Sequence, residues 1–135
     1  MKRFLHDVRE RVKSMMQGRH NTVYSLETDD IGVRIKSLTM ENEAGEVTFR
    51  WDAVTAVKTY KLDLFSVDCI CLAFETSDGW IEVNEDMKPF GPFLEALERH
   101  LPGFPPQKDW WQQVMLPAFA PNERELWKKR FANDH

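Results

Sequence analysis

The chain has 135 residues, of which 42% are apolar and 30% are charged, a composition typical of a folded globular domain. No apolar run approaches the roughly 20 residues that a helix needs to cross a bilayer. Two cysteines are too few for a disulfide framework or a four-cysteine metal site. Charged residues interrupt the start of the chain before the apolar stretch of a signal peptide can form. We therefore expect one cytoplasmic domain over residues 1–135.

Charge is distributed unevenly along the chain. Residues 1–20 carry a net charge of +4 and residues 101–135 a net charge of +1, whereas residues 21–100 hold sixteen acidic and seven basic side chains, a net charge of −9. An acidic middle disfavours nucleic acid as a partner, because each phosphate contact needs a lysine or arginine. It suits a basic protein partner, since complementary fields accelerate the encounter. The alternative is that the acidity only keeps the protein soluble.

Residues 1–18 predict an amphipathic helix that ends at Gly18. One face of this helix is basic, and the apolar residues recur at three-to-four spacing on the other: Phe4, Leu5, Val8, Val12, Met15 and Met16. Such a helix can lie on an anionic membrane or in the groove of a partner. We favour the alternative that it packs on the body of the domain, because the apolar stripe is short.

A β-rich stretch follows, in which apolar and polar residues alternate with a period of two. Turns are expected at residues 28–30, 42–45 and 77–79, where Asp, Asn and Gly residues favour them. The segment 67–74 is apolar on both faces and predicts a central strand that is covered on both sides. We expect about six or seven antiparallel strands that form a curled sheet, a barrel or a sandwich, with strands near residues 24–26, 31–35, 47–51, 54–60, 67–74 and 80–83.

The period then changes to that of a helix. Pro92 fits only in a first turn, so this helix is expected to begin near Gly91, and Pro102 ends it. We expect it to plug an open end of the sheet with its apolar face, which carries Phe90, Phe93, Leu94, Leu97 and Leu101. The polar residues before it are expected to complement its free amides: Asn84, Glu85 and Asp86.

The tail over residues 102–135 is punctuated by proline and rich in tryptophan. It contains two short helical candidates, at residues 109–115 and 122–131. A disordered tail would not hold three tryptophans, so we expect it to be ordered and packed against the domain. The alternative is an aromatic surface used for binding. The apolar residues of these two candidates are Trp110, Trp111, Val114, Met115, Leu126, Trp127 and Phe131.

The order of these elements, antiparallel strands followed by one capping helix, resembles the pleckstrin-homology-like (PH-like) fold of small single-domain bacterial proteins. The resemblance covers residues 24–101 and rests on the hairpin over 26–33, on the segment 49–57 and on the helix over 90–101. In that segment an aromatic residue, an acid and spaced β-branched residues enter a central strand, as Trp51, Asp52, Val54 and Val57 do. The resemblance implies an α+β, PH-like core over residues 22–101, with the segments 1–18 and 102–135 as additions to it.

Lipid-binding members of the PH-like fold hold phosphoinositide headgroups with basic residues in the loop between the first two strands. Here that loop carries Asp29 and Asp30, whose carboxylates would repel a phosphorylated inositol. Arg34 and Lys36 are the only basic residues on the second strand. We therefore do not expect phosphoinositide recognition.

No motif in the sequence indicates a reaction. Cys69 and Cys71 share one face of a strand and are interpreted as small apolar core residues. The glycines are isolated and form no phosphate-binding loop. The four histidines show neither metal-ligand nor triad spacing: His6, His20, His100 and His135. We expect no enzyme activity, no cofactor and no metal site.

One loop stands out as a candidate for partner binding. Residues 61–68 place leucine and phenylalanine between acids at an expected hairpin turn, and an apolar anchor rimmed by charge is common in interfaces. The alternative is that Leu62 or Phe65 folds back onto the core. The candidate partner-binding residues are Leu62, Asp63, Leu64, Phe65 and Asp68.

The sequence thus predicts a non-catalytic protein-binding module, monomeric or homodimeric. More narrowly, we expect an immunity protein that neutralises a bacterial toxin by docking an acidic face on a basic active-site cleft. A peripheral membrane or lipid-associated module that uses the basic helix over residues 1–18 is the second hypothesis. An enzyme with an unrecognised site is the third.

Overall fold

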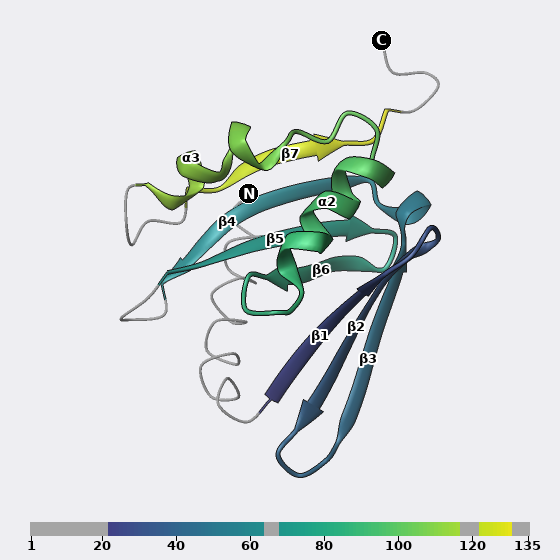
Figure 1. The fold of residues 1–135 in the computed structure, drawn as a ribbon. Coiled ribbons are helices and arrows are strands. Elements are labelled where there is room, and N and C mark those ends of the chain that lie inside the picture. The colour runs from purple at the N-terminus through teal and green to yellow at the C-terminus, as the bar shows by residue number, and fades with distance from the viewer. Residues whose placement is uncertain (1–21, 64–67, 117–121, 131–135) are drawn as a thin grey trace.

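The computed structural model describes residues 22–63, 68–116 and 122–130, and the expected helix over residues 1–18 lies outside them. The described chain has an α+β architecture with two antiparallel sheets (Figure 1). The three-stranded sheet, in the order β1-β2-β3, is formed by β1 (Thr22–Thr28), β2 (Gly32–Thr39) and β3 (Ala44–Arg50). The four-stranded sheet, in the order β6-β5-β4-β7, is formed by β4 (Ala56–Asp63), β5 (Asp68–Thr76), β6 (Gly79–Asn84) and β7 (Arg124–Lys128).

The six strands expected before the helix are all present, but in the described residues the two sheets do not close into a barrel. A short 3-10 turn, η1 (Trp51–Ala53), carries the chain from β3 into the second sheet. The turn between β1 and β2 forms as its chemistry predicts, because Asp29 Oδ1 accepts hydrogen bonds from the amides of Ile31 and Gly32 at 2.8 and 3.0 Å. Trp51 Nε1 donates to the carbonyl of Asp29 at 2.8 Å and so ties this turn to η1.

Helix α2 (Phe90–His100) occupies the segment where the sequence predicts a helix, but the expected capping by residues 84–86 is wrong. The helix begins after Pro89, which makes no side-chain cap hydrogen bond. Asn84 Oδ1 instead accepts from the amide of Asp86 at 3.0 Å, and Glu85 Oε1 accepts from the amide of Ile70 at 3.0 Å. These two side chains therefore satisfy the backbone of the loop and of β5 instead of the free amides of the helix.

The tail differs from the sequence prediction in its second half. Around the first helical candidate the chain forms η2 (Gln107–Asp109) and α3 (Trp111–Met115). The helix expected over residues 122–131 is wrong, because β7 occupies that segment and pairs with the edge of β4. The free backbone groups of an edge strand offer hydrogen bonds that outweigh a short helical pattern. The pairing continues one residue beyond each strand, where the amide of Lys129 donates to the carbonyl of Thr55 at 2.8 Å.

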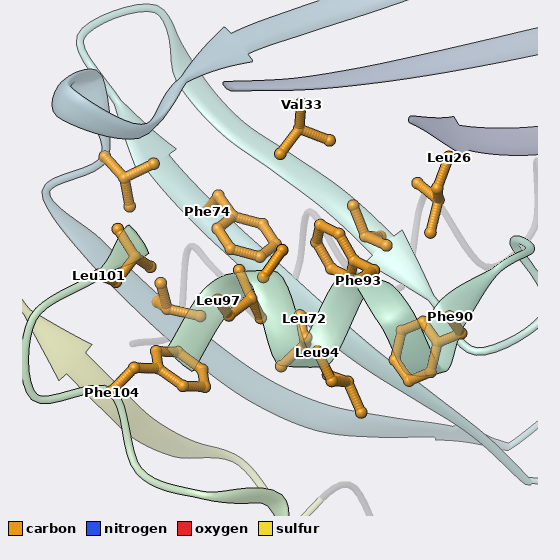
Figure 2. Packing of buried hydrophobic residues seen from close by; sticks show 14 of the residues in the cluster. Leu26, Val33, Leu72, Phe74, Phe90, Phe93, Leu94, Leu97, Leu101 and Phe104 are labelled. Atoms are coloured by element: carbon orange, nitrogen blue, oxygen red, sulfur yellow. The ribbon is translucent and has the colours of Figure 1, made fainter. Parts of the chain in front are cut away.

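The main core lies between the two sheets and includes α2 (Figure 2). Leu26 and Val33 point from the three-stranded sheet toward the four-stranded sheet and α2. The tail contributes the buried residues Phe104 and Trp110, so this part of it is core rather than surface. The α2 residues of this core are Phe90, Phe93, Leu94, Ala96 and Leu97.

The expectation that residues 67–74 form a central, doubly covered strand is confirmed for the described part. β5 lies between β4 and β6, and its side chains are buried on both faces. Ile70, Leu72 and Phe74 face the main core. The alternate residues Cys69, Cys71 and Ala73 belong to a second buried cluster on the opposite face.

Gly32 is required where β2 approaches β3. A Cβ atom at this position would lie 2.1 Å from the carbonyl oxygen of Phe49 and 2.8 Å from the Cα of Arg50. Both are backbone atoms, so a side chain would force the strands apart. Gly91, in the first turn of α2, has no atom within 4 Å of the corresponding position and is a matched control.

We predict that Gly32→Ala lowers the free energy of unfolding by about 1–3 kcal/mol, because the added methyl overpacks a backbone contact. Gly91→Ala should leave it unchanged or raise it by up to about 1 kcal/mol, because alanine favours a helix. Urea denaturation of both variants measures the difference. Equal stability of the two variants would contradict the close approach of β2 and β3.

Candidate functional site

The structure describes only part of the loop expected to bind a partner. Leu62 is 4% exposed and packs against buried neighbours on β4 and β5, so its side chain folds onto the protein. The backbones of Asp63 and Asp68 are paired as the last register pair of β4 and β5. Leu64 and Phe65, like the side chains of the two aspartates, lie outside the described residues. Partner binding by this loop stays a prediction.

Among the described residues, a different surface carries most of the large exposed apolar side chains. Val23, Tyr24, Leu38, Met40 and Val47 lie at the end of the three-stranded sheet farthest from the β1–β2 turn, and they are 40–74% exposed. We call these five residues the distal sheet surface. Figure 1 shows this end of the sheet, with the start of β1 and the β2–β3 turn, projecting away from the four-stranded sheet.

The strand register explains how the distal sheet surface forms. Val23 lies opposite Leu38, and Leu38 lies opposite the exposed Ala44, so an apolar row crosses all three strands on the face turned away from the core. On the other face Val47 lies opposite the buried Ile35 and is itself 47% exposed. A shallow hollow of about 670 Å³ lies at this end of the sheet, lined in part by Val23, Leu38 and Ala44.

The β2–β3 turn beside this surface is fixed by local hydrogen bonds. The amide of Thr39 donates to the carbonyl of Glu43 at 3.0 Å, and the Thr39 hydroxyl accepts from the amide of Glu43 at 3.0 Å. Asn42 adopts a φ of 64°, a left-handed conformation that asparagine tolerates in turns. Met40 is therefore presented to solvent by a defined turn.

Acidic groups border the distal sheet surface. Glu41, Glu43 and Glu46 are exposed in and after the β2–β3 turn. Within the described residues no ion pair involves Glu41 or Glu43, whereas Glu46 pairs with Arg34. The part of the rim that the β2–β3 turn forms is therefore negative.

The basic residues of β2 pair with Glu27, and one of them, Lys36, also lines the hollow beside Leu38. Lys36 Nζ lies 3.2 Å from a carboxylate oxygen of Glu27, and an Arg34 guanidinium nitrogen lies 3.3 Å from the other. The hydrogen bond from Lys36 and that from Arg34 lower the pKa of Glu27 below its ordinary value. Such exposed pairs add little stability, and the charged residues of the β2–β3 turn itself are Glu41 and Glu43.

A second hollow, of about 910 Å³, lies between η1, the end of α2 and the end of β7. Trp51 stacks on His100 with ring centroids 4.9 Å apart, and Lys129 Nζ donates to the carbonyl of Asp52 at 2.8 Å. The Arg50 guanidinium bonds both carboxylate oxygens of Asp52 at 3.0 Å and is the main cause of the lowered pKa of that group. These contacts join η1 to the end of α2 and to the residue after β7, and they bring no base, acid and nucleophile into one cluster.

Over the described ranges, no group of three or more His, Cys, Asp or Glu residues could hold a metal ion. Nor does any helix in that part of the chain combine the length and the apolar character needed to cross a membrane. Comparison of the chain with models of protein families, with curated proteins and with solved structures gives no match. The resemblance to the PH-like fold therefore stays a prediction.

The distal sheet surface was not among the predicted sites, although the sequence contains a signal for it. Val33 and Ile35 alternate toward the core, and Leu38 follows Ile35 at an odd spacing, which places it on the opposite face. Val23 is out of phase with Leu26 in the same way. Two apolar residues out of phase on neighbouring strands indicate an apolar patch on the solvent face.

We predict that Leu38→Ala changes the free energy of unfolding by less than about 1 kcal/mol, because the side chain is half exposed. Ile35→Ala, on the same strand but 6% exposed, should cost about 2–5 kcal/mol. Chemical denaturation of the two variants provides the comparison. A large loss for Leu38→Ala would mean that this residue serves folding and is not available to a partner.

Proposed function

We propose that the protein is a non-catalytic module that binds a basic protein partner through the distal sheet surface. The observation that supports this proposal is the apolar row Val23–Leu38–Ala44, exposed beyond the core and next to the acidic side chains of the β2–β3 turn. A cross-strand row of exposed apolar side chains is costly in water and is typical of a binding surface.

The distribution of apolar and charged groups on this surface matches the anatomy of protein interfaces. Apolar side chains at the centre supply the free energy of association when they are buried, and a charged rim orients the partner. Glu41 and Glu43 would attract a basic surface and accelerate its encounter. The same acids would repel the anionic lipids of a membrane, so this surface favours a protein over a lipid bilayer.

The narrower proposal is inhibition by occlusion, as in an immunity protein that neutralises a toxin. The projecting end of the sheet (Figure 1) is a narrow, acidic body that could enter a basic cleft. Catalytic clefts that bind polyanionic substrates are basic, and an acidic inhibitor would compete for the same charges. In this mechanism the protein supplies no reactive group and works by excluding the substrate.

The test uses affinity capture from the cells that produce the protein, followed by titration of the captured protein against purified variants. Leu38→Asp places a charge in the apolar row. Ile31→Asp makes the same change at a residue that is 64% exposed at the opposite end of the sheet, and it serves as the control. We expect one basic protein to bind the wild type and Ile31→Asp alike, and to bind Leu38→Asp at least about tenfold more weakly.

The affinity should also fall as salt is raised, since the rim acts through charge. If the captured protein is an enzyme, the wild type should inhibit it in proportion to the fraction bound. Capture of no protein would refute the proposal. Equal binding of Leu38→Asp and Ile31→Asp would assign the partner to another surface.

A further inference from the structure

Strand β3 forms one edge of the three-stranded sheet. Figure 1 shows it as the outermost strand on the side away from β1, and among the described strands only β2 pairs with it. Its register with β2 is unbroken from Arg50 to Ala44. The strand contains neither proline nor lysine, two residues that often protect an edge from further pairing. A free edge of this length is a template for one more strand.

The free backbone groups of β3 belong to every second residue. The amide of Trp51 donates to the carbonyl of Ile31 at 3.0 Å, and at the other end the amide of Thr39 donates to the carbonyl of Glu43 at 3.0 Å. In an antiparallel pair, residues bonded to the neighbouring strand alternate with residues that are not. The odd-numbered residues of β3 therefore bond to β2, and the even-numbered residues direct their amide and carbonyl groups away from it.

This edge is open to solvent. The side chains of Glu46, Thr48 and Arg50 are exposed. A hollow of about 580 Å³ lies beside this end of β3 and is lined in part by Thr48, Arg50 and residues of the β5–β6 turn. The opposite edge of the sheet is partly occupied, because the amide of Leu26 on β1 donates to the carbonyl of Lys88 at 2.8 Å. Of the two edges, β3 is therefore the one that the described residues leave open.

We propose that a second copy of the chain pairs with this edge, β3 against β3 in antiparallel orientation, so that the two three-stranded sheets become one continuous sheet. Two copies related by a twofold axis use the same surface, so the edge must be complementary to itself. The sequence of β3 meets this condition, because the opposite charges of Glu46 and Arg50 lie two residues before and two residues after Thr48.

The free backbone groups and the charges favour the same register. When Thr48 of one copy lies opposite Thr48 of the other, Glu46 lies opposite Arg50 of the second copy, and the pair repeats on the other side of the axis. These residues are all even-numbered, so each pair can form backbone hydrogen bonds. Registers centred on Glu46 or on Arg50 would instead place like charges opposite each other. On the other face the half-exposed Val47 would lie opposite Phe49 of the second copy.

The dimer has a consequence for binding. The twofold axis of an antiparallel strand pair is perpendicular to the sheet, so the apolar rows Val23–Leu38–Ala44 of the two copies face the same side. Two linked surfaces bind a bivalent partner more tightly than one surface does. This consequence rests on the proposed function, whereas the dimer itself does not.

Sedimentation equilibrium of the full-length chain over a range of concentrations tests the proposal. A contact limited to strand edges is smaller than the roughly 1,200 Å² that a stable interface buries. We therefore expect a reversible dimer with a dissociation constant between about 1 µM and 1 mM. A chain that stays monomeric up to about 1 mM would overturn the proposal.

Charge reversal tests the register. Glu46→Arg and Arg50→Glu each place like charges opposite each other on both sides of the axis. Each variant should self-associate at least about tenfold more weakly than the wild type. An equimolar mixture of the two variants should dimerise as the wild type does, because every pair across the axis then has opposite charges. The mixture carries the same total charge as two wild-type chains, so net charge cannot explain the recovery.

The matched control is Glu27→Arg. It makes the same change of charge on β1, and like Glu46→Arg it removes an ion pair with Arg34. This control should dimerise as the wild type does. Equal weakening by Glu27→Arg and Glu46→Arg would overturn the proposal, and so would a mixture of the two β3 variants that fails to recover the dimer.

A second measurement uses the wild type alone and does not depend on the folding of any variant. Amide hydrogen exchange at Glu46, Thr48 and Arg50 should slow as the protein concentration is raised, because these amides gain partners only in the dimer. The amide of Val47, which bonds to β2, should be protected at every concentration. Exchange at the three edge amides that is independent of concentration would overturn the proposal. Neither measurement involves the basic partner, so this proposal and the proposed function can fail separately.

Discussion

The fold depends on the packing of Phe74, a fully buried residue in the middle of the four-stranded sheet. Its ring centroid lies 5.0 Å from that of Phe49 on the three-stranded sheet and 5.8 Å from that of Phe93 on α2. These contacts join the two sheets and the helix into one core (Figure 2). Aromatic rings at such distances add to the free energy gained from burial alone.

This core occupies only one end of the three-stranded sheet. Residues near the β1–β2 turn, such as Val33, are buried against Phe74 and its neighbours, whereas Val23 and Leu38 at the other end are exposed. The sheet thus differs in burial along its length. The near end contributes its apolar side chains to the main core, and the far end presents an apolar row to solvent. The proposed binding function follows from this division.

Much of the fold was predictable from local patterns in the sequence. The period-two alternation located the six strands before the helix, and the aspartates of the β1–β2 turn marked a turn that the structure confirms. The apolar residues of α2 repeat at helical spacing, which located that helix. These features were predictable because each is decided by residues close together in the chain.

What escaped prediction depends on distant contacts. Residues 124–128 have a helical pattern, but the unpaired edge of β4 draws them into a strand. The separation into two sheets depends on η1, where Trp51 is held by the distant carbonyl of Asp29. The candidate loop could not be judged from sequence, because the burial of Leu62 depends on what packs against β4 and β5. The distal sheet surface becomes evident only when the phase of the apolar residues is compared between paired strands. No single strand shows it.

The central claim is that Phe74 couples the three-stranded sheet to the four-stranded sheet. A double-mutant cycle with Phe49→Leu, Phe74→Leu and the combined variant tests it most directly, with urea denaturation as the measurement. The account predicts that the two substitutions are not additive, with a coupling of about 0.5–1.5 kcal/mol. Additive losses, within about 0.3 kcal/mol, would show that the two rings do not interact and would contradict the shared core.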